Sequence, residues 1–153
     1  MACNTRLVTV PIDPQAELGD VLADSHGAGA VVSFCGIARS SASDGSKVTA
    51  LHLDHYPGMT EASLEAIAWD GARRFDASHV QIVHRCGTIA PGEVIVFVAA
   101  AASHRRAAFL AADYLMDRLK TEAVFWKKEQ GIDGGRWIEP TDDDRAGQAR
   151  WSE

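Results

Sequence analysis

The sequence predicts an α+β fold in which about three helices pack against a mixed or antiparallel sheet as a sandwich. Three long segments place apolar residues at helical spacing, and about six shorter segments are rich in β-branched or alternating apolar residues. The 153 residues, 46% of them hydrophobic, suffice for a domain with a buried core. We therefore expect a single domain over residues 1–140, followed by an acidic, flexible tail over residues 141–153.

The first half of the chain alternates between strand and helix patterns. Asp13 and Pro14 predict a helix start, because a carboxylate caps the free amides and proline suits the first turn. This helix is expected to end near Gly27. The remaining segments are a short strand at Leu7–Val10, a strand at Ala28–Ile37, a polar loop at Ala38–Lys47, a strand at Val48–Tyr56 and an amphipathic helix at Met59–Phe75.

The second half continues with the same two patterns. Ser103 is expected to cap a helix that reaches about Lys120. Residues 139–153 include three consecutive aspartates and few side chains suited to burial, which predicts mobility. The other segments are strands at His79–Arg85 and Glu93–Ala101 around a turn at Cys86–Gly92, an extended segment at Ala123–Glu129, a loop at Gly131–Gly135 and a short strand at Arg136–Ile138.

Composition excludes several classes of partner. The formal charge is −6 and the pI is near 5.4, which argues against a broad nucleic-acid surface. No stretch approaches the roughly 20 apolar residues that span a bilayer. The three cysteines are far apart and form no CxxC pair, which is typical of reduced thiols in a cytoplasmic protein.

Ser103, His104 and Arg105 stand where a predicted apolar strand ends and a predicted helix begins. The free amides at a helix start attract anions, and Arg105 adds a planar donor fork suited to phosphate. His104 can move a proton near neutral pH. The alternative is that Ser103 only caps the helix while both neighbours are solvated.

Lys120 and Lys127 follow this helix. A desolvated lysine can act as a proton donor or a nucleophile, and Lys127 is expected to share a strand face with Phe125 and Glu129. The alternatives are a surface lysine at a helix end for Lys120 and a protective edge-strand lysine for Lys127. Arg39 begins a serine-rich loop after a strand, a position that often carries binding groups.

Other chemistry has weaker support in the sequence. Cys35 and Cys86 fall in or beside predicted strands without a basic partner clearly placed to make a thiolate, so we expect structural thiols. The odd spacing of His52 and His55 points them to opposite strand faces, so we expect no metal site. No GxxxxGK[ST] or GxGxxG nucleotide loop is present.

Several segments together resemble the MoaE family, the large catalytic subunits of molybdopterin synthase. The resemblance runs collinearly over about residues 5–140. The matching segments are Gly29–Gly36 with Arg39, Leu53–Thr60 (LDHYPGMT), His84 and Arg85, Gly87, Pro91–Glu93, Ser103–Arg105, Met116–Lys120 (MDRLK), Phe125–Glu129 (FWKKE), and Arg136 with Trp137.

The resemblance implies a fold, an activity and partners. The fold would be of the α/β hammerhead type, and residues 1–140 would form the catalytic domain of a homodimer at the centre of a heterotetramer. The outer partners would be small ubiquitin-like sulfur carriers (MoaD-like) that end in a Gly-Gly thiocarboxylate. Two sulfurs would pass from them to cyclic pyranopterin monophosphate, forming the dithiolene of molybdopterin in molybdenum cofactor biosynthesis. No resident cofactor is implied.

The resemblance also assigns roles to individual positions. The family's active-site lysines fall on Lys120 and Lys127. Its substrate-contacting residues fall on Arg39, His104, Arg105, Lys128 and Glu129. Cations suit a phosphate-bearing substrate, and lysine and histidine suit proton transfer to departing oxygens.

Two other functions stay open at this point. The same cations could belong to a non-catalytic module that binds a phosphorylated metabolite, which ligand binding without turnover would reveal. A persulfide sulfurtransferase would instead need Cys35 or Cys86 to be exposed and acidic.

Overall fold

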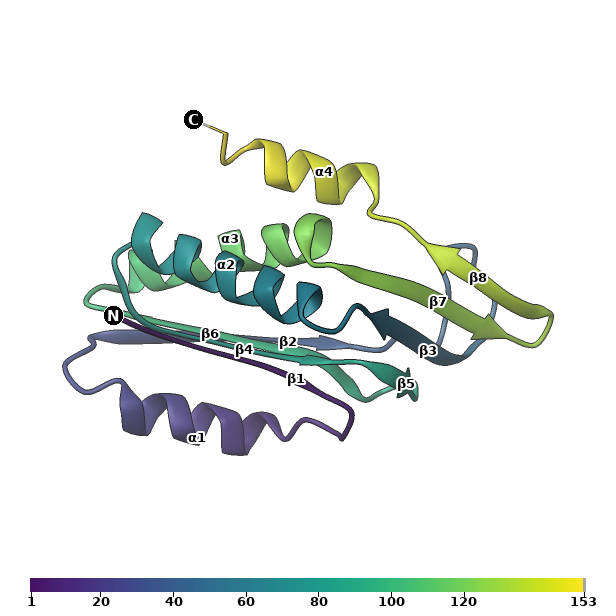
Figure 1. The fold of residues 1–153 in the computed structure, drawn as a ribbon, viewed down its shortest axis with the longest axis horizontal. Coiled ribbons are helices and arrows are strands. Elements are labelled where there is room, and N and C mark those ends of the chain that lie inside the picture. Colours follow the sequence, from purple (N-terminus) through teal and green to yellow (C-terminus); the bar gives the residue numbers. More distant parts are fainter. Residues whose placement is uncertain (153) are drawn as a thin grey trace.

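Two sheets organise residues 1–152, the part of the chain that the computed structural model describes (Figure 1). The first sheet has the order β1-β4-β6-β2. Its outer strand β1 runs parallel to β4, whereas β6 is antiparallel to both β4 and β2, so the sheet is mixed. The strands are β1 (Ala2–Val8), β2 (Ala30–Ile37), β4 (Ala77–Arg85) and β6 (Val94–Ala102).

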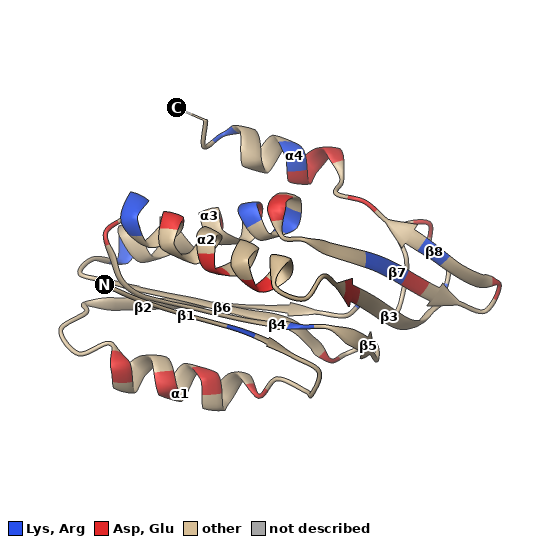
Figure 2. Cartoon of the chain, in the orientation of Figure 1, with Lys and Arg blue, Asp and Glu red and all other residues tan. Residues whose placement is uncertain are grey.

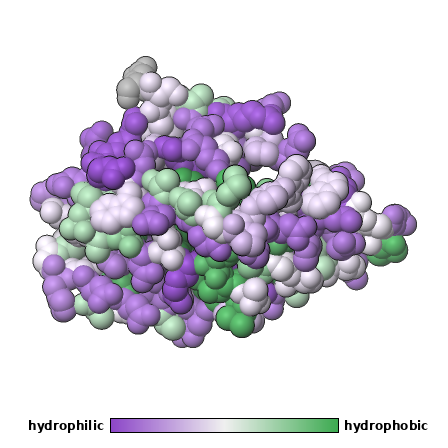
Figure 3. Space-filling view, viewed as in Figure 1, coloured by the Kyte–Doolittle hydropathy of each residue, from purple (hydrophilic) through white to green (hydrophobic). Residues whose placement is uncertain are grey.

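The second sheet is antiparallel throughout and has the order β5-β3-β7-β8. Figure 1 shows it beside one end of the first sheet, with the β7–β8 hairpin reaching away from the helices. Apolar atoms mark the hairpin tip in Figure 3, where Ile132 is 77% exposed. The strands are β3 (Val48–His55), β5 (Gly87–Ile89), β7 (Phe125–Gly131) and β8 (Gly134–Ile138).

Helices cover both faces of the first sheet. Figure 1 places α1 (Pro14–Asp24) on one face, and α2 (Met59–Arg74) with α3 (Arg105–Glu122) on the other. The predicted cap of α1 is confirmed, because the Asp13 carboxylate accepts a hydrogen bond from the backbone N–H of Gln15 at 3.0 Å.

The core forms where β4 and β6 lie between the helix layers. Side chains of β4 alternate between a large cluster under α2 and α3 and a smaller cluster under α1. Small residues bring the layers close together. A Cβ at Gly29 would lie 2.2 Å from the backbone oxygen of Ser103, and one at Gly71 would lie 2.7 Å from Leu115 Cδ2.

Helix α3 begins one residue later than the sequence predicts. His104, not Ser103, is the N-cap, and its side chain makes no capping hydrogen bond. The first turn also contains no acidic residue. The start of this helix is therefore fixed by the preceding buried strand β6 and not by a side-chain cap.

The structure contains more regular elements than the sequence predicts. Four helices are present among residues 1–152 instead of about three, β1 already begins at Ala2, and β5 lies inside the predicted turn. The extra helix, α4 (Asp142–Ala149), occupies most of the segment expected to be a flexible tail. Glu153, the last residue of that segment, lies outside the described residues.

Helix α4 has a physical basis in its capping box and in its contacts with α3. Thr141 Oγ1 accepts a hydrogen bond from the Asp144 backbone N–H at 3.1 Å, and the Asp144 carboxylate accepts one from the Thr141 backbone N–H at 2.8 Å. Three aspartates in the first turn suit the positive helix start. Trp151 then packs edge-on against Tyr114, with ring centroids 5.3 Å apart.

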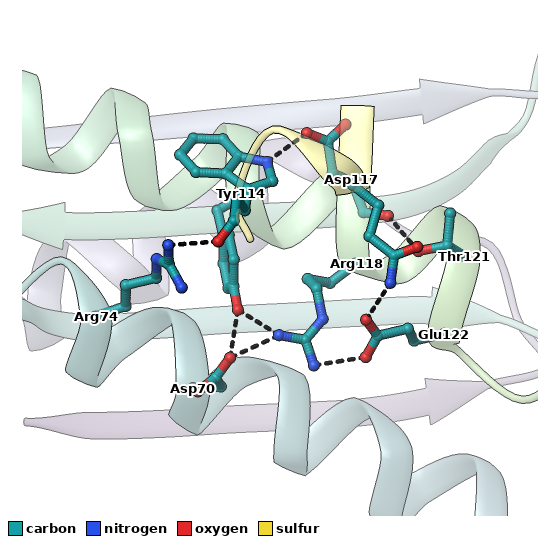
Figure 4. A network of polar contacts seen from close by, with 9 residues as sticks. Asp70, Arg74, Tyr114, Asp117, Arg118, Thr121 and Glu122 are labelled. Atoms are coloured by element: carbon teal, nitrogen blue, oxygen red, sulfur yellow. Dashed lines mark hydrogen bonds and ion pairs between the residues drawn. The ribbon is translucent and has the colours of Figure 1, made fainter. Parts of the chain in front are cut away.

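A polar network on the surface of α3 holds these helices together (Figure 4). Arg118 donates to Asp70 of α2 at 2.6 Å and pairs with Glu122 at 2.5 Å. The Trp151 indole N–H donates to Asp117 at 2.6 Å, while Arg74 of α2 donates to the Trp151 carbonyl at 2.6 Å. The segment after Pro140 is thus anchored on both α2 and α3.

Within residues 1–152, no helix combines the length and the apolar character needed to span a membrane.

Candidate functional site

Lys127 lies on the inner, apolar face of the second sheet. Its neighbours across the strands are Leu53 of β3 and Ile138 of β8, and Leu53 is 1% exposed. Burial and then repulsion from the Lys120 ammonium together lower the pKa of Lys127 from 10.5 to about 8, against the opposing attraction of Asp144. The fold therefore produces an amine that is partly unprotonated near neutral pH.

Lys120 reaches the same region from the last turn of α3, where it is exposed. A negative charge from α4 balances the pair, because Asp144 raises the pKa of Lys127. Burial raises the pKa of Asp144, but hydrogen bonds from Thr141 and attraction to both lysines bring it below its usual value. In Figure 2 the basic segments of β7 and the end of α3 lie below the acidic start of α4.

Two groups near these lysines, Asp144 and His84, have no role that the sequence indicates. Asp144 falls in the segment expected to be a flexible tail, and His84 falls in a segment that resembles the MoaE family. His84 is the penultimate residue of β4, is 4% exposed, and interacts electrostatically with Lys127 and Lys120. A histidine at the carboxyl end of a buried strand is the signal that could have identified it.

The structure separates Lys128 and Glu129 onto opposite faces of β7, as the strand alternation predicts. Lys128 lies on the outer face, where its Nζ is 5.5 Å from the ring centroid of Trp137. Glu129 shares the face of Lys127 and accepts from Arg136 Nε at 3.2 Å. Arg136 also reaches Asp44 at 3.5 Å, which links the hairpin to the loop that begins at Arg39.

Arg39 follows β2 at the same end of the first sheet as His84. The register places Ile37 opposite Val94 of β6, and His84 opposite Val96 of that strand. A hydrogen bond fixes the backbone just before this loop, because Ala38 donates its backbone N–H to the Glu93 carbonyl at 2.9 Å. Arg39 itself is exposed.

His104 and Arg105 lie at the opposite end of the molecule from the lysines. Arg105 begins α3 and Lys120 stands in its last turn, 15 positions later. At 1.5 Å per residue, this places their backbones about 22 Å apart. Within a single chain, His104 and Arg105 therefore do not lie beside the lysines.

The structure argues against several alternatives raised by the sequence. Lys127 is no edge-strand lysine, because β7 lies between β3 and β8. Burial raises the pKa of Cys35 and of Cys86, so neither favours the thiolate that a persulfide carrier requires. His52 pairs with Asp54 at 2.8 Å, but no group of three or more metal-ligating side chains occurs within residues 1–152.

Comparison with known proteins identifies the family. The sequence profile described as "MoaE protein" matches residues 7–122. The "Molybdopterin synthase catalytic subunit" of Caulobacter vibrioides is 50% identical over 147 residues, which are 96% of each chain. The protein of the same name from Pseudomonas aeruginosa is 45% identical over 148 residues, which are 97% of this chain and 98% of the other.

A solved structure agrees with these sequence relatives. The "Molybdopterin biosynthesis MoaE protein" of Burkholderia ambifaria superposes with a TM-score of 0.84 at 43% identity and covers 99% of both chains. The match extends past the profile into the segment that forms α4. The chain therefore belongs to the MoaE family.

Proposed function

We propose that this chain is the catalytic subunit of molybdopterin synthase. It takes two sulfurs from the thiocarboxylated C-termini of small sulfur-carrier subunits and inserts them into cyclic pyranopterin monophosphate, which forms the dithiolene of molybdopterin. The observation that carries the proposal is Lys127, a lysine with a pKa of about 8 on an apolar sheet face beside a second lysine. Relatives at 45% and 50% identity that bear this enzyme's name support it.

The lowered pKa suits both steps that sulfur transfer requires. With a pKa of about 8, roughly a tenth of Lys127 is a free amine at pH 7, available as a base or as a nucleophile toward the carrier's acyl carbon. The protonated majority can donate to an oxygen that leaves the substrate. Lys120, which is exposed, can supply the positive charge that a thiocarboxylate requires.

The two ends of α3 belong to one site only if a second copy completes it. We assign Arg39, Lys120, Lys127, Lys128 and Glu129 to one half, and His104 with Arg105 to the other half, from a second subunit. Arg105 and Arg106 occupy a helix start that has no acidic residue and no side-chain cap. Cations are unfavourable at that position unless an anion is bound, so a substrate phosphate is a fitting ligand.

The surface along β2 offers a place for this second copy. Strand β2 lies at the edge of the first sheet, so one row of its backbone groups is free to pair. Beside it lies a shallow cavity of about 240 Å³ lined by residues of β2 and α3. The exposed apolar side chains there include Phe34 at 42% and Phe109 at 61%. A homodimer at this edge, flanked by two carriers, would form the heterotetramer.

Two further assignments belong to this proposal. Residues 1–140 would form the catalytic domain, with α4 as an appendage at its surface. A cytoplasmic location fits a biosynthetic enzyme with free cysteines, three of which are present.

The test is a reconstituted reaction with thiocarboxylated carrier and cyclic pyranopterin monophosphate. We expect Lys127→Ala to reduce molybdopterin formation at least about a hundredfold, because it removes the amine whose pKa is lowered to about 8 on this sheet face. Lys47→Ala, in an exposed loop, is the matched control and should retain activity. Normal turnover by the Lys127 variant would contradict the assignment, and substrate binding without turnover by the unmodified protein would favour a binding module.

A further inference from the structure

His84 occupies the junction between the two sheets. It is the penultimate residue of β4 in the first sheet, and its ring stacks on Phe125 of β7 in the second. The ring centroids are 4.2 Å apart and the planes differ by 25°. Phe125 lies two residues before Lys127 on the same strand face, so the imidazole is held beside the strand that carries the lysine.

One hydrogen bond determines which imidazole nitrogen carries the hydrogen. His84 Nδ1 lies 2.8 Å from the backbone carbonyl oxygen of Arg85. A carbonyl only accepts hydrogen bonds, so Nδ1 must be the donor. In the neutral ring Nε2 then has a free lone pair. The ring is held at one edge by this hydrogen bond and on one face by Phe125. Its Nε2 is therefore an acceptor of fixed orientation.

Two lysines act electrostatically on His84. Burial first, and then the positive charges of Lys127 and Lys120, lower the pKa of His84 from 6.5 to about 3, against the opposing effect of the Arg85 hydrogen bond. The carboxylate that faces the lysines from α4 is Asp144. His84 therefore stays neutral at any pH at which the enzyme would work, so it cannot be a third cation in the site.

We propose that His84 is a positioning residue for the proposed sulfur transfer, whose Nε2 lone pair accepts a hydrogen bond from the amine of Lys127 and fixes its direction. This inference rests on the proposed function only for its effect on turnover. The choice of Lys127 over Lys120 follows from the strand geometry, since Phe125 and Lys127 share one face of β7 and Phe125 is the stacking partner.

A purely structural role explains only one of the two imidazole nitrogens, Nδ1, which donates to the Arg85 carbonyl. A phenylalanine at position 84 would stack on Phe125 and fill the same space without placing a polar ring beside two ammonium groups. Burying a polar group costs free energy unless its hydrogen-bonding capacity is used. Nδ1 uses half of that capacity, and the amine of Lys127 would use the other half.

The experiment compares two substitutions that keep different parts of the imidazole. His84→Gln retains an acceptor near the position of Nε2. His84→Phe retains an aromatic ring that stacks on Phe125 and excludes water, but it has no acceptor. The first readout is the pH dependence of Lys127 modification by an amine reagent, with Lys127→Ala as the blank. An acceptor stabilises the ammonium form, so its loss should move the Phe variant's curve about half a pH unit or more to lower pH, while the Gln variant stays near wild type.

The second readout is turnover in the reconstituted reaction. His84→Phe should lower kcat at least about tenfold with an unchanged KM for the carrier, and His84→Gln should recover most of kcat. Thermal unfolding reports whether each variant folds, and His84→Leu replaces the Phe variant if that one does not. Equal modification curves and equal kcat for wild type and the variant without the acceptor would overturn the proposal, as would a Gln variant as impaired as the Phe variant. A shifted modification curve in a protein that forms no molybdopterin would instead refute the proposed function and leave the role of His84 intact.

Discussion

Lys127 is placed where a lysine is costly to the fold. Its ammonium lies on an apolar sheet face beside Leu53, and a second cation, Lys120, repels it. The lowered pKa measures this cost, because the protonated form is disfavoured in the folded state and unperturbed in the unfolded chain. The burial of Lys127 therefore lowers the stability of the fold and at the same time makes its amine more reactive.

Lys127→Met should stabilise the protein at pH 7 by about 1–3 kcal/mol, because it removes a desolvated charge and keeps an unbranched side chain. The folded-state pKa is about 8 against an ordinary 10.5, so the unfolded state binds more protons between these values. The wild-type free energy of unfolding should therefore rise as pH increases from 8 to 10.5, and the advantage of the variant should shrink over that window. Urea unfolding at pH 7 and pH 10 measures both, and a variant less stable than wild type at pH 7 would contradict this explanation.

The residue pattern of β7 was predictable from the sequence, but its electrostatics were not. Strand alternation alone placed Lys127 with Phe125 and Glu129, and the structure confirms it. His84 and Asp144 are 43 and 17 positions away from Lys127 along the chain. No local pattern shows that a strand end and a later helix come within electrostatic range of one amine, because their proximity depends on the tertiary fold.

Among the elements, helices with strong end signals were predicted well and α4 was not. Asp13 caps α1 as expected, since a capping carboxylate is a local feature. The Asp142–Asp144 run by itself indicates only a charged segment, although Thr141 and Asp144 form a capping box. What holds α4 is a long-range contact of Trp151 with Phe75 and Tyr114, which local sequence does not reveal.

Trp151→Ala should release α4 from α3 and destabilise the protein by about 1–3 kcal/mol, because it removes two edge-on aromatic contacts and the hydrogen bond to Asp117. Arg145→Ala on the same helix is the matched control. Its ion pair with Asp142 at 3.0 Å is on the surface, so its loss should change stability by less than about 0.5 kcal/mol. Chemical denaturation of both variants tests this, and equal effects would show that α4 is not held by Trp151.

Gly29 and Gly19 offer a second matched pair. At Gly29 a Cβ would lie 2.2 Å from the Ser103 oxygen, so Gly29→Ala should push β2 away from the start of α3 and cost about 2–4 kcal/mol. Gly19 lies inside α1 with open space around its Cα, so Gly19→Ala should stabilise by about 0.5–1 kcal/mol. Thermal unfolding of the two variants should show shifts of opposite sign, and a neutral Gly29 variant would contradict the close approach.

At the scale of the whole molecule, the length of α3 supports the proposed assembly. Arg105, of the proposed phosphate-binding pair, and Lys120, of the proposed catalytic pair, stand near the two ends of α3, with backbones about 22 Å apart. A two-fold dimer contains two copies of each half-site and can bring unlike halves together across the interface. Figure 3 shows hydrophilic and hydrophobic atoms mixed over one face of the single chain. We place the second copy at the open edge of β2.

The most direct test of this account is complementation between two inactive variants. Lys127→Ala and Arg105→Ala are mixed, unfolded and refolded together, and molybdopterin formation is measured with thiocarboxylated carrier. If each site takes Lys127 from one subunit and Arg105 from the other, every mixed dimer contains one intact site, and the mixture should recover about a quarter of wild-type activity. Each variant treated alone should stay inactive. A mixture as inactive as its components, in a sample shown to contain mixed dimers, would contradict the shared site.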